Sequence, residues 1–136
     1  MPSHDAAAIA RRWCELYSDG TPDSYGSDRV LELYAPDCEW IEHSNLNGTR
    51  RGGPEDLRRI LRENAASMRD RRVQLHRVIG GGEEVAMHCT WSATLAEDAF
   101  GRAKGTRLMA EVASLLRVRD SVIVRIEEFV TNLRAT

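Results

Sequence analysis

The chain has 136 residues, of which 42% are hydrophobic and 29% charged, a composition that fits one folded domain over residues 1–136 and argues against a disordered chain. Its 19 basic and 21 acidic residues give a net charge of −2, and acidic residues are interleaved with the arginine pairs. This balance argues against nucleic-acid binding, which usually requires a basic excess or stripe.

Three helices are predicted in the first half of the chain. Apolar residues at helical spacing predict the first helix over 5–18, and Ser3 or Asp5 can cap its start. A short second helix is predicted over 28–34. The stretch GPED at 53–56 is typical of a helix start, with proline and then acids in the first turn, and it predicts a third helix to about residue 68. A strand is predicted over 38–43, followed by a polar loop over 44–53.

From residue 72 onward, the apolar residues follow a period of two instead of a helical period. Strands are predicted over 72–79, 84–95, 106–118 and 122–130, and the three glycines at 80–82 predict a hairpin turn. Helices followed by antiparallel strands indicate an α+β domain, in which helices pack on one face of a curved sheet.

The cysteines and the N-terminus predict the compartment. Cys14, Cys38 and Cys89 are far apart and lack metal-ligand spacing, so we expect free thiols and no metal site. The first residues are too polar for a signal peptide, and no apolar run approaches the ~20 residues of a membrane span. We therefore expect a cytoplasmic protein with no membrane partner and, in the absence of a nucleotide motif, no cofactor.

The predicted strand at 38–43 places a carboxylate and an aromatic ring on one face, since Trp40 and Glu42 alternate with Ile41. Two interpretations of Glu42 remain open. It is either a strand-end carboxylate paired with Arg50 or Arg51, or a base inside a pocket. Burial beside Trp40 would raise its proton affinity toward neutral pH, where a general base works best.

Three stretches, LYAPDCEWIEH, NGTRRGGPEDLRRIL and LLRVRDSVIVRIEEF, resemble the nuclear-transport-factor-like superfamily. The closer likeness is to its SnoaL-type polyketide cyclases, ketosteroid isomerases and limonene-epoxide-hydrolase-like proteins. The resemblance implies a cone-shaped, strongly curved, mostly antiparallel sheet wrapped around about three N-terminal helices, known as a cystatin-like roll. It also implies a deep apolar pocket open at one end, and a homodimer formed through the outer sheet face.

The resemblance also assigns site residues. Glu42 falls where ketosteroid isomerases keep their catalytic aspartate, and the oxyanion-hole positions become Trp13 and Ser114, with Tyr17 one helical turn on. The epoxide-hydrolase likeness implies an acid in the last strand, which is Glu127 or its neighbour. The arginine–aspartate pair of those enzymes is not evident on the long strand, and no subfamily's active site is intact.

Other candidates have two interpretations each. His88 is either a hydrogen-bonded sheet residue or an acid/base group. Asn45 either forms a turn or orients a water or substrate carbonyl. Trp13, Tyr17, Trp40 and Trp91 are core residues that could also contact a flat or alicyclic ligand.

Together these observations predict a cofactor-independent enzyme that acts on a small, apolar, polyketide- or terpenoid-like substrate. Isomerisation, aldol-type cyclisation and epoxide opening all remain open. The predicted catalytic groups are Glu42, Glu127 and His88. Substrate contacts are expected from Trp13, Tyr17, Trp40, Asn45, Trp91 and Ser114. The alternative is a ligand-binding or dimerisation module of the same fold without chemistry, as the broken subfamily motifs suggest.

Overall fold

The computed structural model describes residues 5–18 and 29–136. Within these residues lie two α-helices, α1 (Ala6–Tyr17) and α3 (Pro54–Ser67), and a 3-10 helix, η2 (Val30–Leu33). Asp5, one of the two predicted caps, caps α1, because its side chain accepts a hydrogen bond from the backbone N–H of Ala7 at 2.9 Å. Ser3, the other candidate, lies outside the described residues.

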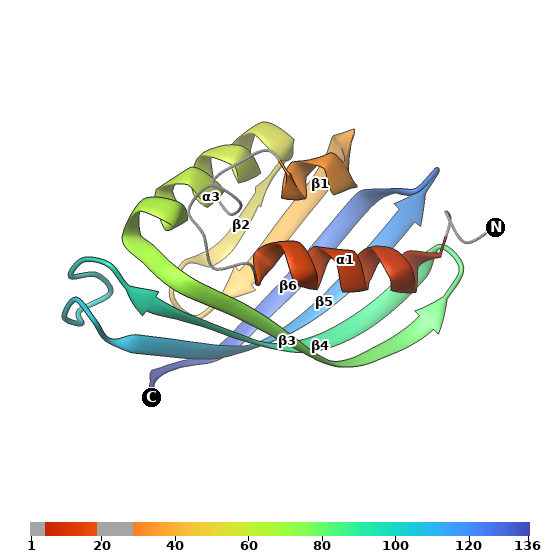
Figure 1. Ribbon diagram of the computed structural model, residues 1–136. Helices are drawn as coiled ribbons and strands as arrows, with labels where there is room; N and C mark the ends of the chain where they lie inside the picture. Colours follow the sequence, from red (N-terminus) through yellow and green to blue (C-terminus); the bar gives the residue numbers. More distant parts are fainter. Residues whose placement is uncertain (1–4, 19–28) are drawn as a thin grey trace.

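The strands are β1 (Tyr34–Ser44), β2 (Gly48–Gly52), β3 (Met68–Gly81), β4 (Glu84–Leu95), β5 (Arg107–Arg119) and β6 (Val122–Ala135). They form one six-stranded sheet in the order β2-β1-β6-β5-β4-β3 (Figure 1). Neighbouring strands are antiparallel except for β1 and β6, which run parallel. The last strand of the chain therefore lies in the interior of the sheet.

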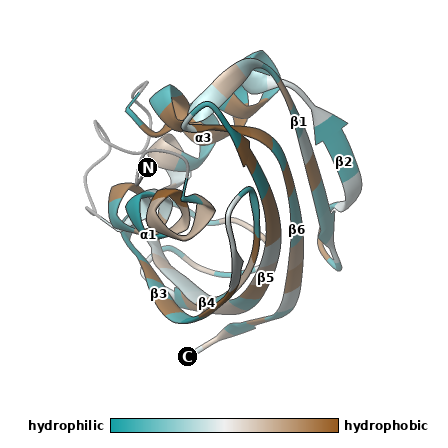
Figure 2. Ribbon diagram, turned by 90° about the vertical axis from the view of Figure 1, so that its right-hand side faces the viewer, coloured by the Kyte–Doolittle hydropathy of each residue, from teal (hydrophilic) through white to brown (hydrophobic). Residues whose placement is uncertain are grey.

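The sheet curves around the helices, and Figure 2 shows α1 and α3 on its concave side. Alternation along the strands supplies the core. In β5 the even-numbered residues from Leu108 to Val118 are buried, and the odd-numbered ones are more exposed. The buried apolar residues of α1 and α3 pack onto this inner face. The predicted α+β class and curved, cone-shaped sheet are confirmed.

Several predicted boundaries are wrong. The polar stretch expected as a loop over 44–53 contains β2, which pairs with β1 despite its sequence, GTRRG. The second helix, expected over 28–34, is a 3-10 turn from Val30 within the described residues, and Tyr34 already begins β1. β3 starts at Met68, directly after α3, so the chain passes from helix to strand with no loop.

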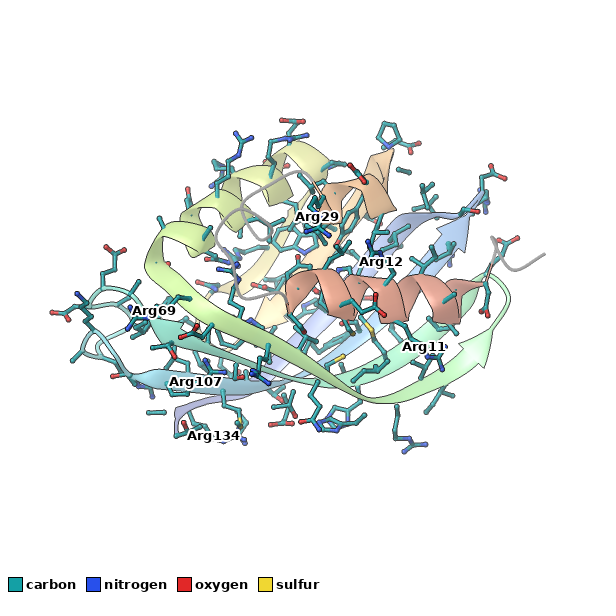
Figure 3. All side chains as sticks on the ribbon, in the orientation of Figure 1. Arg11, Arg12, Arg29, Arg69, Arg107 and Arg134 are labelled. Carbon is teal, nitrogen blue, oxygen red and sulfur yellow. The ribbon has the colours of Figure 1, made fainter. Side chains whose placement is uncertain are left out.

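Most of the described arginines are dispersed over the surface, but Arg71 is buried, with only 1% of its area exposed. Figure 3 labels arginines on α1, before η2, and on β3, β5 and β6. Several are bound by neighbouring groups. Arg134 lies 3.2 Å from Glu111, and Arg107 donates to Ser92 at 2.7 Å. No helix in residues 5–18 and 29–136 is long and apolar enough to span a membrane.

Candidate functional site

A cavity of about 490 Å³ lies between the concave face of the sheet and the two α-helices. Its lining is predominantly apolar, with Trp13 and Tyr17 from α1, Leu57 and Leu61 from α3, and Trp91 from β4. Polar and charged residues make up the rest of the lining, and Glu42, Arg50 and Glu128 are three charged residues among them. A concave, mostly apolar cavity with a few convergent polar groups is typical of a small-molecule site.

Glu128 is the carboxyl group with the most perturbed environment in the cavity. It lies on the inner face of β6, and its Oε2 accepts a hydrogen bond from Trp40 Nε1 at 3.1 Å. Its second oxygen, Oε1, has no hydrogen bond or ion pair with any described residue. Desolvation, followed by repulsion from Glu42, raises the pKa of Glu128 to about 7. At neutral pH this carboxyl group can therefore both take up and release a proton.

Glu42 lies beside Glu128, because the two residues face each other in the parallel pair β1–β6. Glu42 is also opposite Arg50 in the antiparallel pair β1–β2. Its Oε1 accepts hydrogen bonds from Nη2 of Arg50 at 2.7 Å and from Nε at 3.1 Å. The guanidinium carbon lies 5.6 Å from the centre of the Trp40 ring. Glu42 therefore lines the cavity and is paired with Arg50, one of the two arginines expected, and its role as a base stays a prediction.

A buried tyrosine, Tyr34, lies near enough to Glu128 to be affected by its charge. Trp13 Nε1 donates to Tyr34 Oη at 2.8 Å, and the Trp13 and Tyr17 rings stack at 4.2 Å. Burial, and then the charge of Glu128, raise the pKa of Tyr34 well above its usual range. The indole N–H groups of Trp13 and Trp40 are therefore already bonded to protein groups, Tyr34 and Glu128, and are not free for a substrate.

Glu127 and His88 do not reach the cavity. Glu127 lies on the outer face of the sheet, 2.7 Å from His43 Nε2, and this hydrogen bond is the main cause that lowers its pKa. His88 is also on the outer face, with its Nε2 3.6 Å from Glu111 and a side chain that is 47% exposed. These two predicted candidates are therefore separated from Glu42 by the thickness of the sheet.

The remaining predicted residues lie on the inner side. Trp13, Tyr17, Trp40, Asn45 and Trp91 line the cavity. Ser114 lies opposite Glu128 in the β5–β6 pair, but it is buried behind the cavity wall, and its hydroxyl has no hydrogen-bond partner among the described residues. Over the same residues, no group of three or more metal-ligating side chains is placed to hold a metal ion.

Comparison with known families identifies the class of protein. The model of the SnoaL-like domain family matches residues 10–126, so the chain belongs to this family, within the nuclear-transport-factor-like (NTF2-like) superfamily. No functionally curated protein matches the sequence significantly.

Solved structures with the same fold come from bacteria and fungi. BvnE pinacolase from Penicillium brevicompactum is 18% identical, with 90% of this chain and 80% of that chain covered and a TM-score of 0.71. IdmH, a candidate polyketide cyclase from Streptomyces antibioticus, is 20% identical, with 93% of this chain and 91% of that chain covered and a TM-score of 0.69. An NTF2-like protein from Burkholderia thailandensis is 21% identical, with 91% of this chain and 88% of that chain covered and a TM-score of 0.66. At these identities the likeness shows the fold alone.

Proposed function

We propose that the protein is a cofactor-independent enzyme that moves a proton on a small, mostly apolar substrate, with Glu128 as the general acid/base. The observation that carries the proposal is the position of this carboxyl group, which lies in a mostly apolar cavity, has a pKa of about 7, and has one oxygen without a hydrogen bond to any described residue. A general base is most effective when its pKa lies near the working pH. Strongly perturbed carboxyl groups in clefts are frequent at catalytic sites.

The reaction we favour is proton transfer next to a carbonyl group. Glu128 Oε1 takes a proton from the carbon beside the carbonyl, and the electron pair of the C–H bond moves onto the carbonyl oxygen. The enolate then either receives the proton at another carbon, which is isomerisation, or attacks a second carbonyl of the same molecule. In that aldol-type cyclisation the new alkoxide takes the proton from Glu128.

The developing oxygen charge needs a hydrogen-bond donor. Arg50 supplies the cationic donor of the cavity lining, and its Nε and Nη2 bind Glu42. Its third nitrogen, Nη1, makes no bond with a described residue. We infer that Nη1 donates to the substrate oxygen, a role for which the family resemblance offered Trp13, Ser114 and Tyr17.

Epoxide opening is a second reaction that this site supports. An acid in the last strand and an arginine–carboxylate pair are the groups that the epoxide-hydrolase likeness requires. Glu128 is the acid in the last strand. Glu42 and Arg50 form the arginine–carboxylate pair, which lies on β1 and β2 instead of on the long strand β4. Glu128 would take a proton from a water molecule that attacks an epoxide carbon, the C–O bond to that carbon would break, and the resulting alkoxide would take the proton back from Glu128.

Replacing Glu128 by Gln tests the proposal, because the amide keeps the shape and cannot accept the proton. We expect turnover to fall by about 10²–10⁴-fold, measured on a panel of enones, β-polyketones and epoxides. The matched control is Glu127→Gln, which makes the same change one residue away on the outer face and leaves turnover unchanged. The wild-type pH–rate profile is expected to bend near pH 7.

Two results would contradict the proposal. Equal turnover by wild type and Glu128→Gln would remove Glu128 from the chemistry. If the wild type binds apolar ligands but turns over none of the panel, the alternative holds, and the chain is a ligand-binding module.

A further inference from the structure

Two exposed apolar side chains lie at the mouth of the cavity and take no part in the chemistry proposed above. Phe100 is 41% exposed and Leu46 is 46% exposed, and both line the cavity. Leu46 belongs to the turn between β1 and β2, whereas Phe100 belongs to the loop between β4 and β5. Since β6 lies between β1 and β5 in the sheet, these two segments flank the end of β6 on either side (Figure 1).

Phe100 occupies a backbone position that its side chain disfavours. Ala99 and Arg102 exchange two backbone hydrogen bonds of 3.0 and 2.9 Å around the pair Phe100-Gly101. The φ angles of this pair are 55° and 71°, which makes a two-residue hairpin of type I′. Such turns strongly favour Asn-Gly or Asp-Gly, because a bulky residue with positive φ is strained. Phenylalanine is therefore disfavoured at the first position of this turn.

The loop that carries Phe100 is fixed at its base. The backbone N–H of Lys104 donates to Asp98 Oδ1 at 2.7 Å, and that of Gly105 donates to the Leu95 carbonyl at 2.9 Å. The first bond closes the loop around the small hairpin, and the second ties the loop to the end of β4. The aromatic ring is therefore held at the cavity mouth by a structured loop.

We propose that Phe100 and Leu46 form a preformed apolar clamp that contacts the outer part of an elongated apolar ligand whose reacting end lies at Glu128. The proposal rests on the proposed function, because it requires a ligand in this cavity. A bound molecule that reaches the mouth would cover both side chains and remove their apolar surface from water. Local strain is often kept where it serves ligand contact, which accounts for a phenylalanine in a turn that favours asparagine. The substrate class is therefore an extended apolar molecule that spans the cavity.

The variant Phe100→Asn tests the clamp, because it improves the turn and removes the ring. We expect its Tm to rise by about 2–4 °C through relief of strain. We also expect the Kd for the neutral apolar probe N-phenyl-1-naphthylamine to rise by about 3–10-fold, measured by fluorescence titration. Leu46→Ala is expected to weaken probe binding in the same direction.

Two controls separate the clamp from general surface effects. Phe100→Tyr keeps an aromatic ring in the strained turn, so the Kd should stay within about twofold of wild type. Ile79→Ala removes another exposed apolar side chain, which lies on the outer face and lines no part of this cavity, and the Kd should not change.

Unchanged probe binding by both Phe100→Asn and Leu46→Ala would overturn the clamp and leave the acid/base proposal standing. Failure of the wild type to bind the probe would overturn the ligand cavity, and with it the clamp. If Glu128→Gln loses turnover but binds the probe normally, the acid/base proposal is supported and the clamp is unaffected. The failure of each proposal is therefore recognised by a different measurement.

Discussion

At the scale of single residues, the buried environment that suits Glu128 to the proposed acid/base role should also lower the free energy of unfolding at neutral pH. Its pKa in the folded protein is about 7, compared with an ordinary value of 4.5. Between these two pH values the folded chain holds a proton that the unfolded chain has released. The free energy of unfolding therefore falls as the pH rises through this window, by about 3 kcal/mol in total, and stays low above it.

Glu128→Gln should remove this fall, because an amide does not titrate. We expect the variant to unfold at higher urea concentration than wild type at pH 8, and the advantage to vanish near pH 4.5. Urea unfolding at several pH values measures this. A wild type that keeps constant stability from pH 4.5 to pH 8 would show that Glu128 is not desolvated.

Trp40 should tune the same group. Its indole N–H is bonded to Glu128 Oε2, and this hydrogen bond favours the charged form and lowers the pKa of Glu128 against the effect of burial. Trp40→Phe removes the donor and keeps an aromatic ring in the core. We expect the bend of the pH–rate profile near pH 7 to move upward by about one unit. A profile that stays in place would mean that Glu128 does not control the rate.

At the scale of elements, the cap of α1 is a clear test of local structure. The Asp5 side chain accepts a hydrogen bond from a backbone N–H of the first turn, and α1 carries Trp13 and Tyr17 into the cavity wall. Asp5→Ala should lower the free energy of unfolding by about 1 kcal/mol, measured in urea. Asp5→Asn should lower it much less, because asparagine also caps helices well. Equal losses in both variants would point to the charge of Asp5 instead of its cap.

The elements were predictable where one local signal determined them. Helical apolar spacing and the GPED start located α1 and α3, and alternation located β4 and β5. β2 escaped prediction because GTRRG has no apolar alternation, and its pairing with β1 holds it in the sheet. The turn residues at 44–53 suggested one long loop, but only three residues, 45–47, separate the end of β1 at Ser44 from the start of β2 at Gly48.

The candidate site was predictable in part for a similar reason. Trp40 and Glu42 were placed on one face by their spacing, and this is confirmed. Alternation of Met87, Cys89 and Trp91 could also have placed His88 on the outer face. In contrast, Glu127 and Glu128 are adjacent, and the choice between them depends on the pairing of β6 with β1 and β5, which local sequence does not reveal.

At the scale of the whole molecule, we propose that two copies associate through the outer sheet face. Leu115 and Phe129 lie on this face and are 47% and 38% exposed. Two apolar side chains on neighbouring strands of an open face suit contact with a second copy, as the family resemblance implies. Light scattering should give twice the chain mass, and Leu115→Lys should shift the protein toward monomer. A wild type that is monomeric at high concentration would contradict this.

The central position of β6 determines when the fold can be completed during synthesis. Trp40 and Glu128 are 88 residues apart in sequence yet hydrogen-bonded. At a translation rate of about 5–20 residues per second, β1 must wait several seconds for its parallel neighbour to leave the ribosome. During that delay the β1–β2 hairpin has an unoccupied edge, and Trp40 has not yet formed its hydrogen bond with Glu128. Nascent chains stalled before β6 should therefore be sensitive to protease and should recruit chaperones.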